Sequence, residues 1–253
     1  MTALDALTPR QRDLLARAAQ SYLRGLGYDL GETGPRRDGV DGDPGKLTRD
    51  ALVAWGDRAF PAPPAKPAAP ELTAEMRAWY RNLWDSMRIG DAPAIVNAVS
   101  LITRARPRYE AIEKQTGVPW RVVGVLHYLE CNCNFARHLH NGDPLTARTV
   151  QVPKGRPATG NPPFPWEASA QDALQYDGLA GQSDWSIEAT LFRLEKFNGW
   201  GYFKFTDILS PYLWSMSNHY TRGKYVSDGE FDSAAVSKQV GAAVLLAVLA
   251  KAP

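Results

Sequence analysis

Apolar residues recur at the spacing of an α-helix along most of the chain. Near the start, Thr8 followed by Pro9 is a typical signal for the beginning of a helix. The apolar face of this helix is predicted from positions three or four residues apart: Leu14, Leu15, Ala18, Ala19, Tyr22 and Leu23. A loop rich in glycine and aspartate follows, and LTRDALVAWGDRAF (47–60) predicts a second, short helix. The pattern favours a small helical module that lacks a catalytic constellation.

The rest of the chain is predicted to be mostly helical, with one small strand region. Thr73 is a candidate N-cap and Gly117 a candidate helix stop. The predicted helices cover 73–89, 92–116, 119–135, 184–197 and 232–250. Between them, TARTVQVPKGRPATGNPPF (146–164) is β-prone and rich in turn residues. The expected fold class is therefore mostly α, in an α+β arrangement.

A proline-rich segment, FPAPPAKPAAPE (60–71), separates the two parts. Proline fixes φ and has no backbone N–H, so this composition predicts a semi-rigid, extended spacer. We therefore expect a module at 1–60, a linker at 61–71 and a larger domain at 72–253.

Charge and hydropathy exclude several classes of partner. The net charge is +2 and the pI about 8.5, with no dense stripe of lysine and arginine, so we expect no nucleic-acid partner. The longest apolar run, VGAAVLLAVLA (240–250), is too short to span a bilayer and predicts a buried helix. The N-terminus lacks the basic start and apolar core of a signal peptide, so we expect synthesis in the cytoplasm.

One glutamate occupies an unusual position on a predicted helix. In PWRVVGVLHYLECNCNF, Val122, Leu126 and Leu129 form an apolar stripe, and Glu130 lies on the same face. Burial and the negative end of the helix dipole should raise the pKa of this carboxyl group. A carboxyl group that stays protonated near neutral pH is suited to general-acid catalysis. The alternative is a core glutamate satisfied by an arginine or a backbone donor.

A second carboxylate follows in HLHNGDPL. Asn141 and Gly142 form a tight turn, and Asp143 is expected in an exposed loop where its carboxylate stays ionised. A desolvated carboxyl group that stays protonated and a solvated one that stays ionised are the acid and the base of glycoside hydrolysis. Thr149 begins the alternating segment TVQV, from which its hydroxyl group can orient a water molecule.

The cysteines and histidines near Glu130 offer a competing interpretation. Cys131 and Cys133 are the only cysteines, and with His138 and His140 they could in principle bind zinc. The usual zinc spacings are CxxC and Hx₃₋₅H, so we expect free thiols, no metal and no cofactor. His127 and His138 are expected to be structural rather than to tune Glu130.

The N-terminal motif resembles a known binding module. VDGDPGKLTRDALVAW is similar to the peptidoglycan-binding module of cell-wall hydrolases, a family with a small three-helix-type fold. The matching positions include Asp41, Gly42, Gly45, Thr48 and Trp55. This resemblance implies that residues 1–60 bind the cell wall; the alternative is a spacer domain.

The larger part resembles the lysozyme superfamily, most closely its phage endolysins and muramidases. The order Glu130, Asp143, Thr149, with five residues between the aspartate and the threonine, is that of a helix ending in a catalytic glutamate followed by a small β-hairpin. LFRLEKFNGWGY resembles an element that lines the saccharide cleft in goose-type and lytic-transglycosylase relatives. The resemblance implies sugar contacts from residues in this element and in SPYLWSMSNHYTRG, namely Asn198, Trp200, Tyr202, Asn218, His219 and Tyr220.

Together these patterns predict a monomeric muramidase whose partner is the glycan strand of peptidoglycan, with no membrane insertion. Glu130 would be the acid, Asp143 the base or stabilising charge, and Thr149 a water-positioning residue. The alternatives are a lytic transglycosylase or chitinase-like glycosidase on the same scaffold, and a non-catalytic wall-binding protein. Because the substrate lies in the bacterial cell wall, the enzyme is expected to need a holin or another export route.

Overall fold

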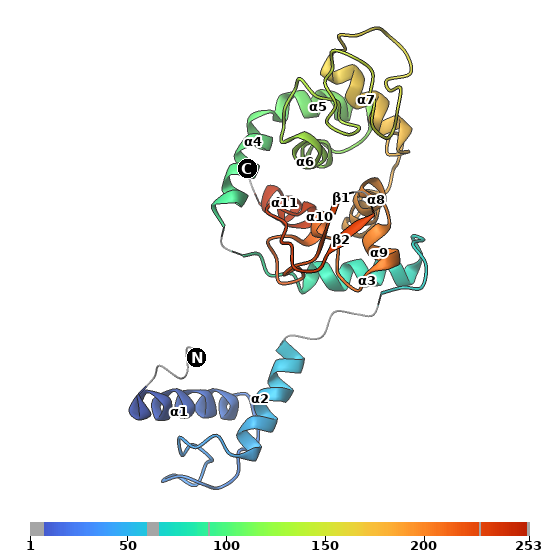
Figure 1. The fold of residues 1–253 in the computed structure, drawn as a ribbon. Helices are drawn as coiled ribbons and strands as arrows, with labels where there is room; N and C mark the ends of the chain where they lie inside the picture. The colour runs from blue at the N-terminus through green and yellow to red at the C-terminus, as the bar shows by residue number, and fades with distance from the viewer. Residues whose placement is uncertain (1–7, 60–65, 91, 228, 252–253) are drawn as a thin grey trace. The chain divides into compact units, whose positions relative to one another are not determined.

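The computed structural model describes residues 8–59, 66–90, 92–227 and 229–251. By its internal contacts the chain divides into two compact units, Met1–Ala62 and Pro63–Pro253. Figure 1 shows the described parts of the first unit in blue and those of the second in cyan to red. Within these ranges, no helix combines the length and apolar character that crossing a bilayer requires.

The first unit contains two helices in its described part, α1 (Pro9–Gly25) and α2 (Lys46–Ala59), rather than the three that the resemblance implies. The predicted start of α1 is confirmed. The Thr8 side chain accepts a hydrogen bond from the Gln11 backbone, and the Gln11 side chain accepts one from the Thr8 backbone. This reciprocal arrangement satisfies two donors that a helix N-terminus otherwise leaves unpaired.

The predicted apolar face of α1 is wrong. Of its members, Leu14, Leu15 and Tyr22 are more than half exposed and only Leu23 is buried, whereas Gln20, which is not part of the predicted face, is buried as well. Leu23 joins a small core with residues of the following loop and of α2. Gln20 is buried because its amide group binds that loop, a long-range interaction that hydrophobic spacing does not report.

The second unit is built from nine helices and one hairpin in its described part. The helices are α3 (Ala74–Asp85), α4 (Pro93–Arg104), α5 (Arg106–Thr116), α6 (Trp120–Cys131), α7 (Trp166–Tyr176), α8 (Ile187–Asn198), α9 (Gly201–Phe205), α10 (Pro211–Trp214) and α11 (Ala242–Leu249). The strands β1 (Lys224–Ser227) and β2 (Glu230–Asp232) pair antiparallel, with Lys224 opposite Asp232. The expected class, mostly α with a small hairpin, is confirmed.

Several local signals place helix boundaries correctly. The Thr73 hydroxyl group accepts the backbone N–H of Met76 at the start of α3. Gly117 ends α5 at a φ of 75°, a left-handed conformation that glycine adopts without steric cost. The helix predicted over 92–116 is divided near Ala105, where Pro107 lies in the first turn of α5 and has no N–H to continue the α4 ladder.

The hairpin lies at 224–232 and not in the β-prone segment 146–164, which forms turns and irregular loop. Asp143 accepts the backbone N–H groups of Val150 and Gln151 with its side chain. Those two donors would otherwise be available to a strand ladder. The strand prediction for this segment is therefore wrong because a carboxylate from outside it binds its backbone.

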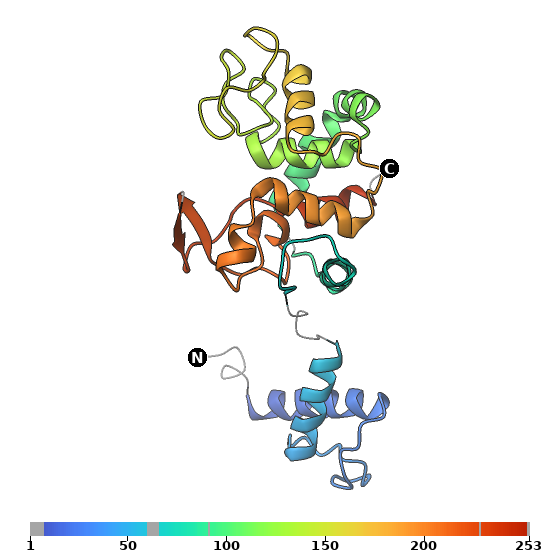
Figure 2. The same cartoon turned by 90° about the vertical axis from the view of Figure 1, so that its right-hand side faces the viewer.

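Helix α6 is a deeply buried helix in the core of its side of the second unit. Its residues from Val122 to Leu129 are buried on every side, as expected for a helix that is apolar all round. Figures 1 and 2 show α5, α6, α7 and the loops between α6 and α7 on one side of the unit. Helices α3, α8, α9 and α10 and the hairpin lie on the other side, and α11 lies between them against α6.

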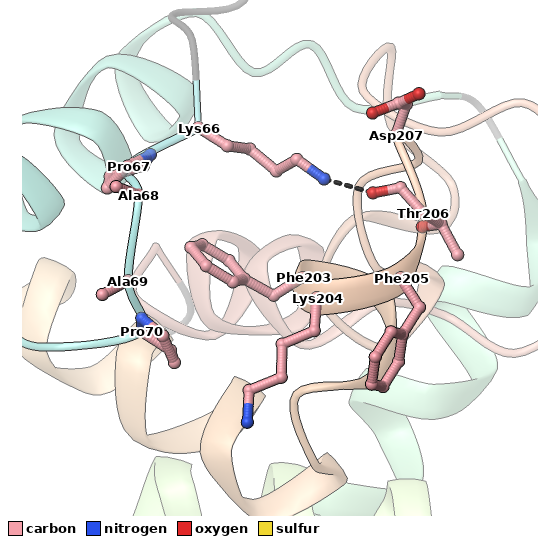
Figure 3. Close-up of a pocket in the computed structure, with 10 residues that line it drawn as sticks. All are labelled: Lys66, Pro67, Ala68, Ala69, Pro70, Phe203, Lys204, Phe205, Thr206 and Asp207. Carbon is pink, nitrogen blue, oxygen red and sulfur yellow. Dashed lines mark hydrogen bonds between the residues drawn. The ribbon is translucent and has the colours of Figure 1, made fainter.

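Part of the predicted linker belongs to the second unit. Residues 60–65 lie outside the described residues. From Lys66 onward the chain packs against α9, where the Lys66 ammonium group donates to the carbonyl oxygen of Thr206 and Pro67 is buried. Figure 3 shows the resulting pocket, with Lys66 reaching across it toward Thr206. Residues 66–70 of the predicted linker line this pocket of about 630 Å³ and thus pack against the second unit.

Candidate functional site

Glu130 lies in the last turn of α6. The helix ends because Asn132 takes the left-handed conformation, and its backbone N–H donates to the carbonyl oxygens of His127 and Tyr128. Glu130 is half-buried, whereas the residues just before it are buried. The end of an apolar helix therefore presents a carboxyl group at the edge of the core.

A hydrogen bond fixes this carboxyl group. The hydroxyl group of Tyr212, on α10, donates to Oε1 of Glu130 over 2.8 Å. Since α6 and α10 lie on opposite sides of the second unit, the bond joins the two sides. A second link lies beside it, from Nε2 of Gln239 to the carbonyl oxygen of Leu129 at 2.7 Å. The carboxyl group is thus held where the two sides meet.

The environment of Glu130 favours its protonated form. Burial raises its pKa to about 7 from an ordinary value of 4.5. The hydrogen bond from Tyr212 lowers the pKa, and the negative charge of Asp177 raises it further. The expected direction of the shift is therefore found, and its partner is a tyrosine rather than the arginine or backbone donor of a core glutamate. Near neutral pH a large fraction of this group can donate a proton.

Asp177 is a second carboxylate close enough to act on Glu130 electrostatically, and the sequence reasoning missed it. It directly follows α7 and is half-buried. Burial raises its pKa to about 6, while the positive charges of Lys196 and Arg156 oppose the shift. Among the described residues, none donates a hydrogen bond to its carboxylate and none forms an ion pair with it. In the sequence it resembles an ordinary residue at a helix end, because its neighbours come from other elements.

Asp143 does not lie in an exposed loop as expected. It is 6% exposed, and its Oδ2 accepts hydrogen bonds from the backbone of Val150 (2.8 Å) and Gln151 (3.1 Å) and from Nδ2 of Asn141 (3.2 Å). Burial alone would raise its pKa, but these hydrogen bonds outweigh it and the pKa is lowered. Asp143 is ionised as predicted, while the prediction of exposure is wrong because the carboxylate folds the 149–152 loop around itself.

Thr149 is also engaged within this loop. It is 2% exposed, its hydroxyl group donates to the carbonyl oxygen of Pro153 at 2.5 Å, and it accepts the backbone N–H of Arg156 at 2.8 Å. The single hydroxyl proton is thus used inside the protein. A role in placing water stays a prediction that this geometry does not favour.

The histidines anchor the same loop to α7. His138 contacts Oγ of Ser169 and the carbonyl oxygen of Ala147, each at 2.8 Å. Nε2 of His140 lies 2.8 Å from Asp172, which also receives Arg156 at 2.6 Å. Both imidazole rings are therefore used to position the loop.

These contacts leave no zinc site of the kind considered from the sequence. Cys131 and Cys133 are free thiols, and burial raises the pKa of both. Nδ1 of His127 lies 2.9 Å from the hydroxyl group of Tyr109, in a structural contact. Across the described part of the chain, no three histidine, cysteine, aspartate or glutamate side chains gather closely enough to hold a metal ion.

Residues of the predicted saccharide element serve mainly in packing. Trp200 contacts the rings of Phe192 and Phe203, with centroids 5.0 and 5.6 Å away. Tyr202 is buried, and its hydroxyl group accepts the backbone N–H of Tyr225. Asn198 is exposed at the end of α8.

The other three predicted sugar contacts lie in a segment tied to neighbouring loops. Oδ1 of Asn218 accepts the Arg88 backbone N–H at 2.6 Å, and the ring of His219 contacts the carbonyl oxygen of Leu83 at 2.7 Å. The hydroxyl group of Tyr220 accepts a backbone N–H at 3.0 Å. Sugar binding by these residues stays a prediction.

The motif that is predicted to bind the cell wall is organised by Gln20, which the sequence reasoning did not select. Nε2 of Gln20 donates to Asp41 at 2.8 Å and to the hydroxyl group of Thr48 at 3.2 Å, and its Oε1 accepts the Gly42 N–H at 2.9 Å. Hydrogen bonds from the side chains of Thr33 and Gln20 lower the pKa of Asp41 to about 2. These motif positions therefore have a structural role within the module.

The remaining motif residues lie at and along α2. The Gly45 carbonyl oxygen accepts the Arg49 N–H at the start of the helix. The ring of Trp55 meets Tyr22 edge-on, with centroids 6.0 Å apart, and packs on the small core. The exposed Tyr22 and the half-exposed Trp55 offer the module aromatic surface.

A second glutamate–tyrosine pair lies deep in the same unit. Glu195, on α8, is 2% exposed, and the hydroxyl group of the fully buried Tyr80 donates to it over 2.5 Å. Burial raises the pKa of Glu195 to about 7, and Tyr80 and the charge of Lys66 oppose the shift. This pair resembles Glu130 and Tyr212 in chemistry but is closed to solvent.

No protein-family model matches the chain, and neither curated proteins nor solved structures provide a match. Function is therefore inferred from the geometry of the second unit and from the motifs described above.

Proposed function

We propose that this protein is a peptidoglycan hydrolase that cleaves the β-1,4 bond between N-acetylmuramic acid and N-acetylglucosamine, with Glu130 as the general acid. The observation that carries the proposal is the carboxyl group of the half-buried residue Glu130, with a pKa of about 7, held by Tyr212 at the junction of the two sides of the second unit. It combines a proton that can be transferred near neutral pH with access from solvent.

Glu130 donates its proton to the glycosidic oxygen as the bond to the anomeric carbon breaks. The hydroxyl group of Tyr212 keeps the carboxyl group oriented in both protonation states, because it donates to Oε1 and leaves Oε2 available for the leaving group. Water then adds to the anomeric carbon, and the resulting sugar has a reducing end.

The choice of peptidoglycan over chitin comes from the first unit. Its Asp-Gly-x-x-Gly-x-x-Thr motif is similar to wall-binding modules, and its exposed Tyr22 and half-exposed Trp55 suit the flat faces of sugar rings. We therefore propose that the module holds the enzyme on the bacterial cell wall, where the enzyme acts as a monomer without a cofactor.

A lytic transglycosylase is the second candidate, and one observation favours it. Asp143 and Thr149, which the lysozyme-like pattern assigns to handling water, use their polar groups inside their own loop. A transglycosylase needs no activated water, because the C6 hydroxyl group of N-acetylmuramic acid attacks its own anomeric carbon and a 1,6-anhydro end results.

Digestion of purified peptidoglycan followed by mass spectrometry distinguishes these possibilities. The expected products of the wild-type protein are fragments with reducing N-acetylmuramic acid ends, and Glu130→Gln should yield none. Fragments with 1,6-anhydro ends would assign the protein to the transglycosylases. Intact strands from the folded wild-type protein would reject the enzymatic proposal for this substrate.

A further inference from the structure

We propose that a second pocket of the second unit binds the peptide stem of peptidoglycan, at a stem residue that carries both a free ammonium group and a free carboxylate group. The pocket has a volume of about 530 Å³ and is lined by residues 207–209, 219–222 and 233–234. It lies between the chain that joins α9 to α10, the chain before β1 and the chain after β2. This inference rests on the proposed hydrolase function and names a further part of its substrate.

Two opposite charges line this pocket without pairing. Asp207 lies just after α9 and Arg222 just before β1, and both residues are exposed. In the part of the chain that the structure describes, neither side chain forms an ion pair or a hydrogen bond. Lys66, which lines the neighbouring pocket together with Asp207, binds the carbonyl oxygen of Thr206 instead (Figure 3). The pocket therefore offers one ligand both a carboxylate and a guanidinium group.

The rest of the lining combines apolar and polar groups. Ile208 and Leu209 supply apolar surface. Thr221 and Ser233 add two exposed hydroxyl groups, and neither is hydrogen-bonded to another described residue. A concave site of roughly 300–1,000 Å³ with a few polar groups on apolar walls is typical of small-ligand binding. The pocket has the size and lining to receive one amino-acid side chain and the peptide around it.

The walls of the pocket are held in place within the unit. The hydroxyl group of Tyr220 accepts the backbone N–H of Ser237 at 3.0 Å, and the backbone N–H of Gly223 donates to the carbonyl oxygen of Ala235 at 2.7 Å. Gly223 has a φ of 95°, and a Cβ atom there would overlap the side chain of Ile208. Glycine thus lets two walls approach closely, and a wall that is already ordered reduces the entropy lost on binding.

The two charges identify the class of ligand. A guanidinium group binds a carboxylate through two parallel hydrogen bonds, and a carboxylate accepts hydrogen bonds from an ammonium group. The N-acetylated sugars of the glycan strand have no ammonium group. A stem with diaminopimelate has both charges at the end of that side chain, whereas a stem with lysine at the same position has the ammonium group alone. The pocket therefore matches a stem that contains diaminopimelate.

The pocket is close enough to the proposed acid for one substrate to occupy both. Four residues of chain separate Ile208 from Tyr212, so their Cα atoms lie at most about 14 Å apart. Tyr212 holds Glu130. The stem is attached to N-acetylmuramic acid, the sugar whose bond Glu130 is proposed to cleave. Its third residue, the diamino acid, lies about 10 Å along an extended peptide, and its own side chain adds to that reach.

Calorimetric titration of the full-length protein with two synthetic stem peptides tests the inference. Both peptides are acetylated at the N-terminus and amidated at the C-terminus, and they have diaminopimelate or lysine at the third position, so they differ only in the distal carboxylate group. The diaminopimelate peptide should bind at least about 10-fold more tightly. Arg222→Gln should abolish this difference, and Asp207→Asn should weaken both peptides. The matched control Lys114→Gln, which removes an exposed positive charge on α5, should bind as the wild type does.

The outcomes separate this inference from the proposed function. Equal affinity of the wild-type protein for the two peptides, or a preference that survives in folded Arg222→Gln, would overturn it. If the protein cleaves the glycan and binds neither peptide, the inference fails and the hydrolase proposal stands. If the diaminopimelate peptide binds through Arg222 while the glycan stays intact, the pocket is confirmed as a peptide site and the hydrolase proposal fails.

Discussion

The second unit contains two glutamate–tyrosine pairs that share their chemistry and differ in access to solvent. In each, a tyrosine hydroxyl group donates to a glutamate whose pKa is raised to about 7 by burial. Glu195 and Tyr80 are enclosed between α3 and α8, whereas Glu130 and Tyr212 are half-buried where the two sides of the unit meet. A raised pKa alone does not distinguish a catalytic acid from a structural one; access of a substrate does.

The comparison also explains why only one pair is expected to govern stability. A buried hydrogen-bonded pair that loses a partner leaves a polar group without water or protein to satisfy it. A half-buried group can be hydrated instead. Glu195 and Tyr80 should therefore contribute to folding, and Glu130 and Tyr212 to catalysis.

The largest effect on stability is expected for Glu195→Ala. This substitution leaves the Tyr80 hydroxyl group unpaired and opens a cavity in the core, so the free energy of unfolding should fall by about 3 kcal/mol. Glu130→Ala should change it by about 1 kcal/mol or less, because solvent reaches the vacated space. Urea unfolding of both variants measures the difference, and equal losses would contradict the proposed contrast between the pairs.

The pH dependence of stability should carry a contribution from Glu195. A glutamate in the unfolded chain titrates near pH 4.5, whereas Glu195 in the folded chain titrates near pH 7. Between these values the folded protein retains a proton that the unfolded chain has released, so stability falls as the pH rises. The contribution is complete below about pH 4.5, lost above about pH 7, and of order 3 kcal/mol in total.

Glu195→Gln removes this titration and should reduce the slope of the stability profile between pH 4.5 and 7, while Glu130, whose pKa is also about 7, keeps its own contribution. Melting temperatures measured across this range for the wild-type protein and the variant test the prediction. An unchanged slope in the variant would show that other groups are responsible.

Removal of each tyrosine hydroxyl group should give a smaller and separable effect. Tyr80→Phe should lower stability by about 1 kcal/mol with little change in cleavage rate. Tyr212→Phe removes the hydrogen bond that lowers the pKa of Glu130, so the basic limb of the pH–rate profile should move to higher pH. Steady-state assays across pH check this, and a basic limb that stays in place would show that Tyr212 does not tune the acid.

Local sequence signals predict much of the fold and only part of the site. The hydroxyl groups of Thr8 and Thr73 and the glycine at 117 act on their own helix ends, so a short window of sequence contains their effect. Glu130 is predictable for the same reason, because its face of α6 follows from the spacing of Val122, Leu126 and Leu129. The fold class and the candidate catalytic acid can thus be predicted without the structure.

The rest of the site depends on contacts between distant residues. Glu195 also follows leucines on its helix, so the spacing that selects Glu130 would select Glu195 as well. Only the packing of α3 on α8, which buries Glu195, excludes it as a catalytic acid. Asp143 was expected in solvent, but the backbone of residues seven and eight positions later encloses its carboxylate. The charge of Asp177 acts on Glu130 only in the folded unit, and Gln20 is buried by a loop more than twenty residues away.

The most direct test of the account compares two isosteric substitutions, Glu130→Gln and Glu195→Gln, in one assay. The rate of reducing-end release from peptidoglycan is measured at pH 6.5 and at a temperature where circular dichroism shows both variants folded. The account predicts a loss of about 100-fold or more for Glu130→Gln. It predicts a rate within a few-fold of wild type for Glu195→Gln. A folded Glu130→Gln variant that cleaves at the wild-type rate, or equal losses in both variants, would contradict it.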